Sequence, residues 1–310
     1  MLRIGIDLGG TNIAAGVVDE GGKIIAKASV PTLAKRPTEE IVSDMAKLCE
    51  TVTEKAGCKL SDITSVGIGV PGTVDDKNGM VVYACNVPMA NTPLAGMLRK
   101  YIDKPIHLEN DANAAALGEY IVNGNGAKSF VFITLGTGVG GGIILDGKIY
   151  CGFNGAGSEL GHMTLVSGGI ECACGKKGCW EQYASVSALV RQTKAVMDKN
   201  PDSIMHEIVK NYGKVSGRTA FEAAKKGDKA AETVVRNYLR YVADGITSIV
   251  NIFQPEKVLI GGGISHEGDY LLKPVCEFVN KYDYNRYMPK TKIEISTLFN
   301  DAGIIGAAML

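Results

Sequence analysis

The 310-residue sequence lacks long hydrophobic runs, and neither sign of charge is in excess. Its apolar stretches fall short of the roughly 18 residues that suggest a membrane-spanning helix. Lys and Arg number 33 together, as do Asp and Glu, so no broad basic surface for nucleic-acid phosphates is expected. The first ten residues, MLRIGIDLGG, show no secretory-signal pattern. We therefore expect a cytoplasmic protein without a membrane or nucleic-acid partner.

Two common nucleotide-binding motifs are also missing. The pattern GxxxxGK[ST] does not occur, and the three glycines at 261–263 do not fit GxGxxG. These absences exclude a P-loop NTPase and leave a dinucleotide-binding fold poorly supported. Histidine is scarce, with four residues in the chain. His107, His206 and His266 have no partner motif beside them, so we interpret them as structural or surface residues.

Glycine, in contrast, is abundant, with 39 residues concentrated in four clusters: GIDLGGTN, GIGVPGT, TLGTGVGGGI and LIGGGIS. Each cluster follows an apolar, strand-like run. Buried strands that end in glycine-rich loops are typical of an α/β sheet whose functional loops lie at the strand ends. The sequence therefore predicts an α/β fold.

Hydrophobic periodicity and helix-start residues locate the individual elements. We expect a helix from about residue 38, with Thr38 as its candidate N-cap. The strand, glycine turn and strand near the N-terminus recur at 130–149, a weak internal repeat that suggests two related lobes. The expected strands are 2–8, 13–18, 66–70, 105–108 and 257–260, and the expected helices are 38–56, 112–120, 185–197, 220–226, 229–253 and 301–310.

The first glycine turn, DLGGTN at 7–12, carries groups that suit a phosphate and a hydrated cation. Its glycines let main-chain N–H groups approach an anion, and Asp7 can hold a hydrated Mg²⁺. Alone, this segment could be only a tight turn after a strand, but two further glycine turns favour a nucleotide site. The expected nucleotide-binding residues are Asp7, Gly9, Gly10, Thr11, Asn12, Gly136, Thr137, Gly138, Gly261, Gly262 and Gly263.

Three of the eight cysteines lie within residues 172–179, closely after His162. In a reducing compartment, clustered thiols indicate a metal site or redox groups rather than disulfides, and three cysteines would leave one unpaired. The remaining cysteines are dispersed, and we interpret them as small buried hydrophobic residues. These are Cys49, Cys58, Cys85, Cys151 and Cys276.

Together these motifs resemble the ROK family of sugar kinases and repressors over essentially the whole chain. DLGGTN and LGTGVGGG are similar to its phosphate motifs, VLIGGGIS to its adenosine motif, and NDANAAALGE to its sugar and catalytic segment. The signature ExGHx9CxCGx2GCxE at 159–181 is the most specific match, and CWEQYAS at 179–185 resembles the bacterial glucokinase branch. The resemblance implies a two-lobed, actin- and hexokinase-like (ribonuclease H-like) α/β fold with a nucleotide and sugar cleft between the lobes. We expect a smaller lobe at 1–118 and 299–310, and a larger lobe at 119–298 that carries a zinc site.

The resemblance also implies roles for individual residues. Asp111 would be the general base, although Asn110 or Asp111 also suits the N-cap of the helix that follows. The segment CNVPMANTP at 85–93 departs from the tryptophan-containing pattern of many relatives. A closed tetrahedral set for a structural Zn²⁺ would consist of His162, Cys172, Cys174 and Cys179. The sugar-binding residues would be Gly72, Asn86, Asn110, Asp111, Glu159, His162 and Glu181.

The function that these motifs favour is ATP-dependent phosphorylation of a hexose, glucose first, at the 6-hydroxyl with Mg²⁺ and ATP. Kinases for mannose, fructose, allose or N-acetylmannosamine remain alternatives, as does a non-catalytic sugar-binding regulator. ROK repressors carry a DNA-binding helix-turn-helix before the first phosphate motif, which starts here at Asp7, so we favour a kinase. A zinc hydrolase would need an open metal site, and HxE is absent near the cysteines. The family implies a homodimer or homotetramer, and the phosphoryl donor could also be another nucleotide or polyphosphate.

Overall fold

The computed structural model describes residues 1–84 and 86–310. These divide into two compact units, of which unit 1 comprises Met1–Phe132, Gly142–Ser158 and Thr297–Leu310, and unit 2 comprises Ile133–Gly141 and Glu159–Ser296. Strands and helices build both units, so the predicted α/β class is confirmed. The predicted lobe boundary between 118 and 119 falls inside helix α3 (Asp111–Asn123). The predicted bounds of the lobes and the cleft between the lobes stay predictions.

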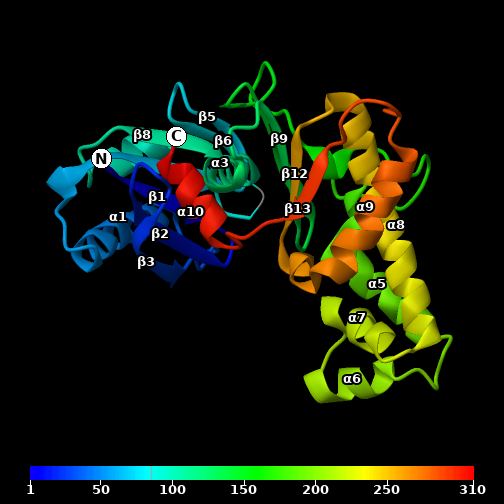
Figure 1. The fold of residues 1–310 in the computed structure, drawn as a ribbon. Coiled ribbons are helices and arrows are strands. Elements are labelled where there is room, and N and C mark those ends of the chain that lie inside the picture. The colour runs from blue at the N-terminus through cyan, green and yellow to red at the C-terminus, as the bar shows by residue number, and fades with distance from the viewer. Residues whose placement is uncertain (85) are drawn as a thin grey trace. The chain divides into compact units, whose positions relative to one another are not determined.

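Unit 1 is built on a five-stranded sheet with the order β3-β2-β1-β4-β8 (Figure 1). The first three strands pair antiparallel, whereas β4 is parallel to both β1 and β8. The register aligns Asp7 with Gly69, and Gly69 with Glu109. The carboxyl ends of three parallel strands therefore meet at one edge. The bounds are β1 Leu2–Leu8, β2 Asn12–Val18, β3 Ile24–Pro31, β4 Ile63–Val70 and β8 Ile106–Asn110.

Helices cover both faces of this sheet. Because side chains alternate along a strand, Ile4 and Ile6 join a hydrophobic core with helix α1 (Thr38–Lys55). On the other face, α10 (Asp301–Ala308) lies so close that a Cβ at Gly5 would be 1.8 Å from a carbonyl oxygen of α10. The closely packed C-terminal helix of small residues is thereby confirmed. Unit 1 also contains α2 Leu94–Arg99, α3, η1 Leu60–Asp62 and a small sheet of β5 Gly72–Asp75, β6 Met80–Ala84 and β7 Ala90–Thr92.

A second five-stranded sheet has the order β11-β10-β9-β12-β13. Strands β10 and β11 pair antiparallel, and β12 and β13 pair parallel. As in the first sheet, three consecutive strands appear in reverse order before the later ones, which agrees with the internal repeat. The bounds are β9 Ser129–Leu135, β10 Val139–Leu145, β11 Lys148–Ile149, β12 Lys257–Gly261 and β13 Lys292–Ile295.

Outside its strands, unit 2 is mainly helical, and the single tryptophan of the chain connects two of its parts. Trp180 is fully buried, and its Nε1 donates a hydrogen bond to the Tyr241 carbonyl at 2.8 Å. Gly245 on α8 leaves room for the indole, since a Cβ there would lie 2.1 Å from a ring atom. The helices are α4 Glu181–Ala184, α5 Val186–Met197, α6 Met205–Tyr212, α7 Gly217–Lys225, α8 Lys229–Phe253 and α9 Asp269–Tyr282, with η2 Leu160–His162 and η3 Gly263–Glu267.

Several sequence predictions need correction. Thr38 does not cap α1: Pro37 occupies the N-cap position, and the Thr38 hydroxyl donates to the Pro88 carbonyl at 2.9 Å. Helices α2, α4, α6 and α9 and strands β3, β5, β6, β7 and β13 were not predicted. Of the dispersed cysteines, Cys49 is buried, Cys85 lies outside the described residues, and the others are only half-buried. Across 1–84 and 86–310, each helix is too short or too polar to cross a bilayer.

Candidate functional site

The start of α3 presents the predicted base. Asn110 is the N-cap: its Oδ1 accepts hydrogen bonds from the main-chain N–H groups of Ala112 and Asn113, at 2.9 and 3.1 Å. Its Nδ2 donates to the Gly72 carbonyl at 3.1 Å. Asp111 is therefore the first helical residue, half-buried at the positive end of the helix dipole. Of the two candidate caps, Asn110 takes the structural role.

Asp7, at the end of β1, lies close enough to Asp111 for the two charges to interact. Burial, and secondarily the charge of Asp111, raises the pKa of Asp7 from 3.8 to about 6. Helix α10 contributes to the crowding, since a Cβ at Gly303 would lie 2.9 Å from Asp7 Oδ2. A cation relieves repulsion between neighbouring carboxylates, so this donor set fits a hydrated Mg²⁺.

The first glycine turn is closed by a main-chain hydrogen bond of its own and is supported by hydrogen bonds from Thr32. The Gly9 N–H donates to the Asn12 carbonyl at 3.0 Å. Thr32, which is fully buried, donates its N–H to the Thr11 carbonyl at 2.8 Å and its hydroxyl to the Gly9 carbonyl at 2.6 Å. Thr11 and Asn12 themselves are exposed. The turn is thus fixed while its polar side chains face solvent, as a phosphate site requires.

Gly10 and Gly72 permit close approaches in the same unit. A Cβ at Gly10 would lie 2.8 Å from the Cβ of Asn86, so this exposed asparagine lies beside the first glycine turn. Gly72 has a φ of +154°, and a Cβ there would lie 2.0 Å from the Tyr83 carbonyl oxygen. Because Gly72 also accepts the hydrogen bond from Asn110, it connects the small sheet to the start of α3.

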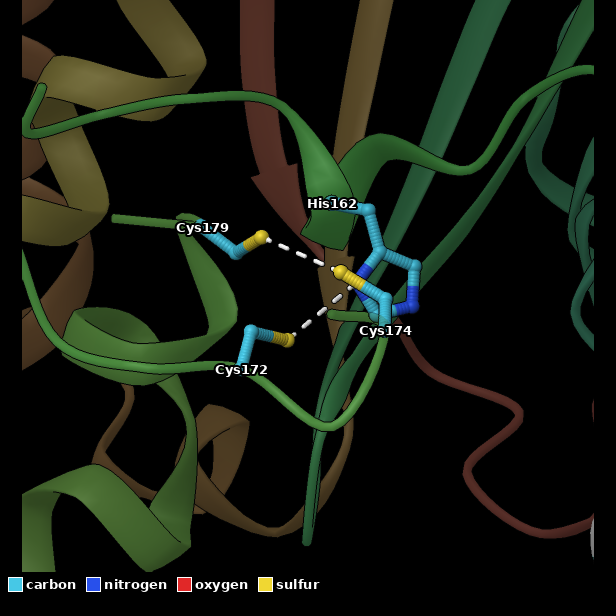
Figure 2. Close-up of side chains that lie close together, drawn as sticks. All are labelled: His162, Cys172, Cys174 and Cys179. Atoms are coloured by element: carbon cyan, nitrogen blue, oxygen red, sulfur yellow. Dashed lines mark hydrogen bonds between the residues drawn. The ribbon is translucent and has the colours of Figure 1, made fainter. Parts of the chain in front are cut away.

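The predicted zinc ligands come together in unit 2, as Figure 2 shows. His162 Nδ1 lies 3.6 Å from Cys172 Sγ, and the Sγ atoms of Cys174 and Cys179 are 3.5 Å apart. One candidate ligand atom from each of these four residues lies within 4.8 Å of the others. A tetrahedral zinc with Zn–S bonds of about 2.3 Å implies S···S separations of about 3.8 Å. The cluster therefore fits a closed Cys₃His site.

Tight turns give the cluster its shape. The Cys172 N–H donates to the Lys176 carbonyl at 2.8 Å, and the Gly175 N–H donates to the Cys172 carbonyl at 2.9 Å. Gly178, with a φ of +82°, lies so close to Val166 that a Cβ would be 1.6 Å from its carbonyl oxygen. This segment contains few apolar anchors besides Trp180, so a metal would supply much of its stability.

The two predicted sugar-binding glutamates have different surroundings. Glu159 is exposed, and its carbonyl accepts the N–H of His162 at 3.0 Å. Glu181 begins α4, and its Oε2 accepts the Val139 N–H at 3.1 Å. A Cβ at Gly138 would lie 2.2 Å from that same oxygen. Glu181 thus supports the second glycine turn, a contact that the sequence did not predict.

The second and third glycine turns are neighbours in unit 2. The Gly136 carbonyl accepts the N–H of Val186, the first residue of α5, at 2.8 Å. Gly262 has a φ of +82°, and a Cβ there would lie 2.4 Å from the Leu135 carbonyl oxygen. Since Leu135 immediately precedes the second turn, the two turns occupy adjoining strand ends, as a shared nucleotide site would need. The predicted members of these turns are Gly136, Thr137, Gly138, Gly261, Gly262 and Gly263.

Glu109 and Cys151 were not predicted as site residues. Glu109 directly precedes the Asn110–Asp111 pair, and its carboxylate accepts a hydrogen bond from the Cys151 thiol at 3.3 Å. A glutamate beside that pair, at the end of a strand, was a usable signal. The thiol lies 42 residues further along and has no local motif.

The other histidines contact carbonyls or a surface acid: His206 lies 3.2 Å from two carbonyl oxygens, for example.

Comparisons with known proteins find matches over essentially the whole chain. The ROK family model matches residues 3–310. The chain is 37% identical to a glucokinase of Thermotoga maritima over 309 residues, covering 99% of this chain and 96% of that protein. It is 38% identical to a glucokinase of Streptomyces coelicolor over 317 residues, covering 100% and 97%. A ROK family glucokinase from Streptomyces griseus, solved in complex with glucose and AMPPNP, matches with a TM-score of 0.84 and 37% identity, covering 100% of this chain and 98% of that one.

Proposed function

The chain belongs to the ROK family, and from this premise we propose that it is a kinase that transfers the γ-phosphoryl group of ATP to the 6-hydroxyl of D-glucose. The observation that carries the proposal is the full-length identity of 37% and 38% to two glucokinases. The products would be glucose 6-phosphate and ADP. The predicted homodimer or homotetramer and the range of phosphoryl donors stay predictions.

In this mechanism Asp111 acts as the general base. Its carboxylate accepts the proton of the sugar 6-hydroxyl as the new O–P bond forms and the bond from the γ-phosphorus to the β–γ bridging oxygen breaks. Positioning and charge stabilisation account for most of the catalysis in such transfers. Asn110, held by Gly72 at 3.1 Å, fixes the helix start that carries Asp111. Asn86, Glu159, His162 and Glu181 would serve as further sugar contacts.

The glycine turns would bind the nucleotide. In unit 1, the turn at Gly9–Asn12 offers main-chain N–H groups to phosphate oxygens, and Asp7 would hold the hydrated Mg²⁺. In unit 2, the turns at Gly136–Gly138 and Gly261–Gly263 would take the remaining phosphates and the nucleoside. When bound, Mg²⁺ would neutralise charge that develops on the phosphates.

The zinc that we assign to His162, Cys172, Cys174 and Cys179 would be structural. A closed set of four protein ligands leaves no position for water. These ligands would fix the segment between Glu159 and Glu181 and so orient both carboxylates. Zinc would take no part in phosphoryl transfer.

The proposal is tested by measuring ADP release from ATP and Mg²⁺ by zinc-replete protein. The sugar panel comprises glucose, mannose, fructose, allose, N-acetylglucosamine and N-acetylmannosamine. We expect the highest kcat/KM with glucose, and glucose 6-phosphate as the product. A higher kcat/KM with another member would identify a different sugar kinase. Binding without turnover of any member would overturn the kinase function and favour a sugar-binding regulator.

Asp111→Asn tests the base. We expect kcat to fall by about 100- to 10,000-fold, the range for loss of a general base, while the glucose Kd measured by calorimetry stays within about threefold. Asp103→Asn is the matched control, since it removes an exposed carboxylate just before β8 in the same unit. Turnover near the wild-type rate in Asp111→Asn would refute the assignment.

A further inference from the structure

Next to the start of α3, the Glu109 carboxylate accepts hydrogen bonds from three donors. Its Oε1 accepts the Asn110 N–H at 2.8 Å and the Asn113 Nδ2 at 3.1 Å. Its Oε2 accepts the Cys151 thiol at 3.3 Å. Glu109 and Cys151 are half-buried, and Asn113 is only 2% exposed. A half-buried carboxylate with this many donors is held in one orientation.

The thiol comes from a separate, well-fixed segment of the same unit. The Gly157 N–H donates to the Cys151 carbonyl at 2.8 Å, which closes the loop that begins there. Nearby, β10 lies so close to α3 that a Cβ at Gly142 would be 3.1 Å from Asn113 Oδ1. Among the described residues, that Oδ1 is buried without a hydrogen-bond partner. The Nδ2 group of Asn113, which faces Glu109 and Cys151, therefore fixes the orientation of the Asn113 amide.

Cys151 acts here as a neutral donor rather than as a nucleophile. Burial, and secondarily the charge of Glu109, raises the pKa of Cys151 to about 12. The thiol therefore keeps its proton at neutral pH, and an S–H group can donate to a carboxylate where a thiolate cannot.

We propose that Glu109 is a positioning residue for phosphoryl transfer and that the Cys151 thiol holds its carboxylate in place. This inference rests on the proposed function, because Glu109 acts through the Asn110–Asp111 turn that carries the base. The peptide N–H bonded to Glu109 belongs to Asn110, one residue before Asp111. When the thiol no longer orients the Glu109 side chain, the hydrogen bond to this N–H weakens and the base can shift; a displacement of about 1 Å can lower the rate by about 100-fold.

Three variants test the inference by steady-state kinetics. Cys151→Ala removes the donor, Cys151→Ser keeps one, and Glu109→Gln removes the charge that the thiol faces while keeping an acceptor for Asn110. We expect Cys151→Ala and Glu109→Gln each to lower kcat about 3- to 10-fold, the loss of one hydrogen bond from a weak donor such as a thiol. KM for glucose and ATP should change less than about twofold, and Cys151→Ser should restore most of kcat.

The double variant Cys151→Ala/Glu109→Gln separates positioning from general damage. If both residues act through one contact, the double variant should be no slower than the slower single variant. Cys276→Ala is the matched control, because the hydrogen bond that this half-buried cysteine makes among the described residues is long, at 4.0 Å to the Ile293 carbonyl. If the wild type phosphorylates a sugar and the effects of the two single variants multiply in the double variant, the inference fails while the proposed function stands. Wild-type kcat in both single variants would have the same consequence. A wild type that phosphorylates no sugar would overturn the inference together with the proposed function.

Thiol alkylation examines the contact without any assay of activity. Iodoacetamide labelling of Cys151, followed by peptide mass spectrometry with the Cys276 peptide as reference, should be slow in wild type. It should be about threefold or more faster in Glu109→Gln, because removal of the charge favours the thiolate. Equal labelling rates in the two proteins would show that the carboxylate does not hold the thiol, and the inference would fail.

Discussion

Replacement of Asp7 with Asn should stabilise the folded protein at neutral pH while it impairs catalysis. The Asp7 carboxylate is an anion in surroundings that oppose its charge. Burial is the larger cause and the charge of Asp111 the smaller, and together they raise the pKa of Asp7 from 3.8 to about 6. A site built to receive a cation keeps such a residue at the expense of stability, a common conflict between stability and activity.

The pKa difference fixes both the sign and the size of the effect. Below pH 3.8, Asp7 is protonated in the folded and unfolded chains alike. As the pH rises, the unfolded chain releases this proton first, whereas the folded chain retains it until about pH 6, so stability falls through this window. A pKa difference of about two corresponds to about 3 kcal/mol. On the order of 1.5 kcal/mol of this loss falls between about pH 5 and 7.5.

The assay is urea-induced unfolding of wild type and Asp7→Asn at about pH 5 and 7.5, without nucleotide or Mg²⁺ to shield the carboxylate. Circular dichroism should report it, because the single tryptophan, Trp180, lies in unit 2 and Asp7 in unit 1. The measured quantity is the change with pH in the difference between the two unfolding free energies. Contributions of the Asn side chain that do not depend on pH cancel in this quantity.

We expect Asp7→Asn to gain on the order of 1.5 kcal/mol relative to wild type between the two pH values. In an Asp111→Asn background the gain should be smaller, because one of the two causes of the raised pKa is gone. Asp103→Asn, which removes an exposed carboxylate, serves as the control. A difference that stays constant with pH, or one that turns in favour of wild type as the pH rises, would refute the reasoning.

Two further predictions concern the supports of the site. Cys174→Ala should lower bound zinc, measured by elemental analysis, from about one ion per chain to near zero, because three ligands hold a structural zinc poorly. The variant should also have a lower melting temperature, followed by Trp180 fluorescence. Full zinc retention would contradict the proposed site. Thr32→Val should raise KM for ATP about 3- to 10-fold through loss of the 2.6 Å hydrogen bond to Gly9. Thr53→Val, which removes another buried hydroxyl of unit 1, should leave KM unchanged, and equal effects of the two variants would contradict a role for the turn.

Much of the local structure was predictable because its signals are local. Helix α8 has the predicted bounds, Lys229–Phe253, since a cap at Asp228 and a proline at 255 frame a long periodic segment. The glycine turns follow strands as predicted, and the four candidate zinc ligands come together as the family resemblance implied. Element boundaries were less certain where packing decides them. The edge strand β3 alternates half-buried and exposed residues without a strong apolar pattern, so its sequence gave little signal.

The support of the candidate base lies beyond such local signals. The identity of Asp111 follows from a motif, but its orientation depends on contacts that join distant segments. Glu109 meets a thiol 42 residues away, and Gly72 reaches Asn110 across 38 residues. A hydrogen bond of this kind leaves no periodicity and no fixed spacing in the sequence, because only the tertiary fold brings its partners together. If Glu109 positions the base as we propose, the residues that determine the rate are therefore of two kinds. The group that accepts the proton can be identified from a sequence motif, whereas the groups that orient it can be identified only from the tertiary fold.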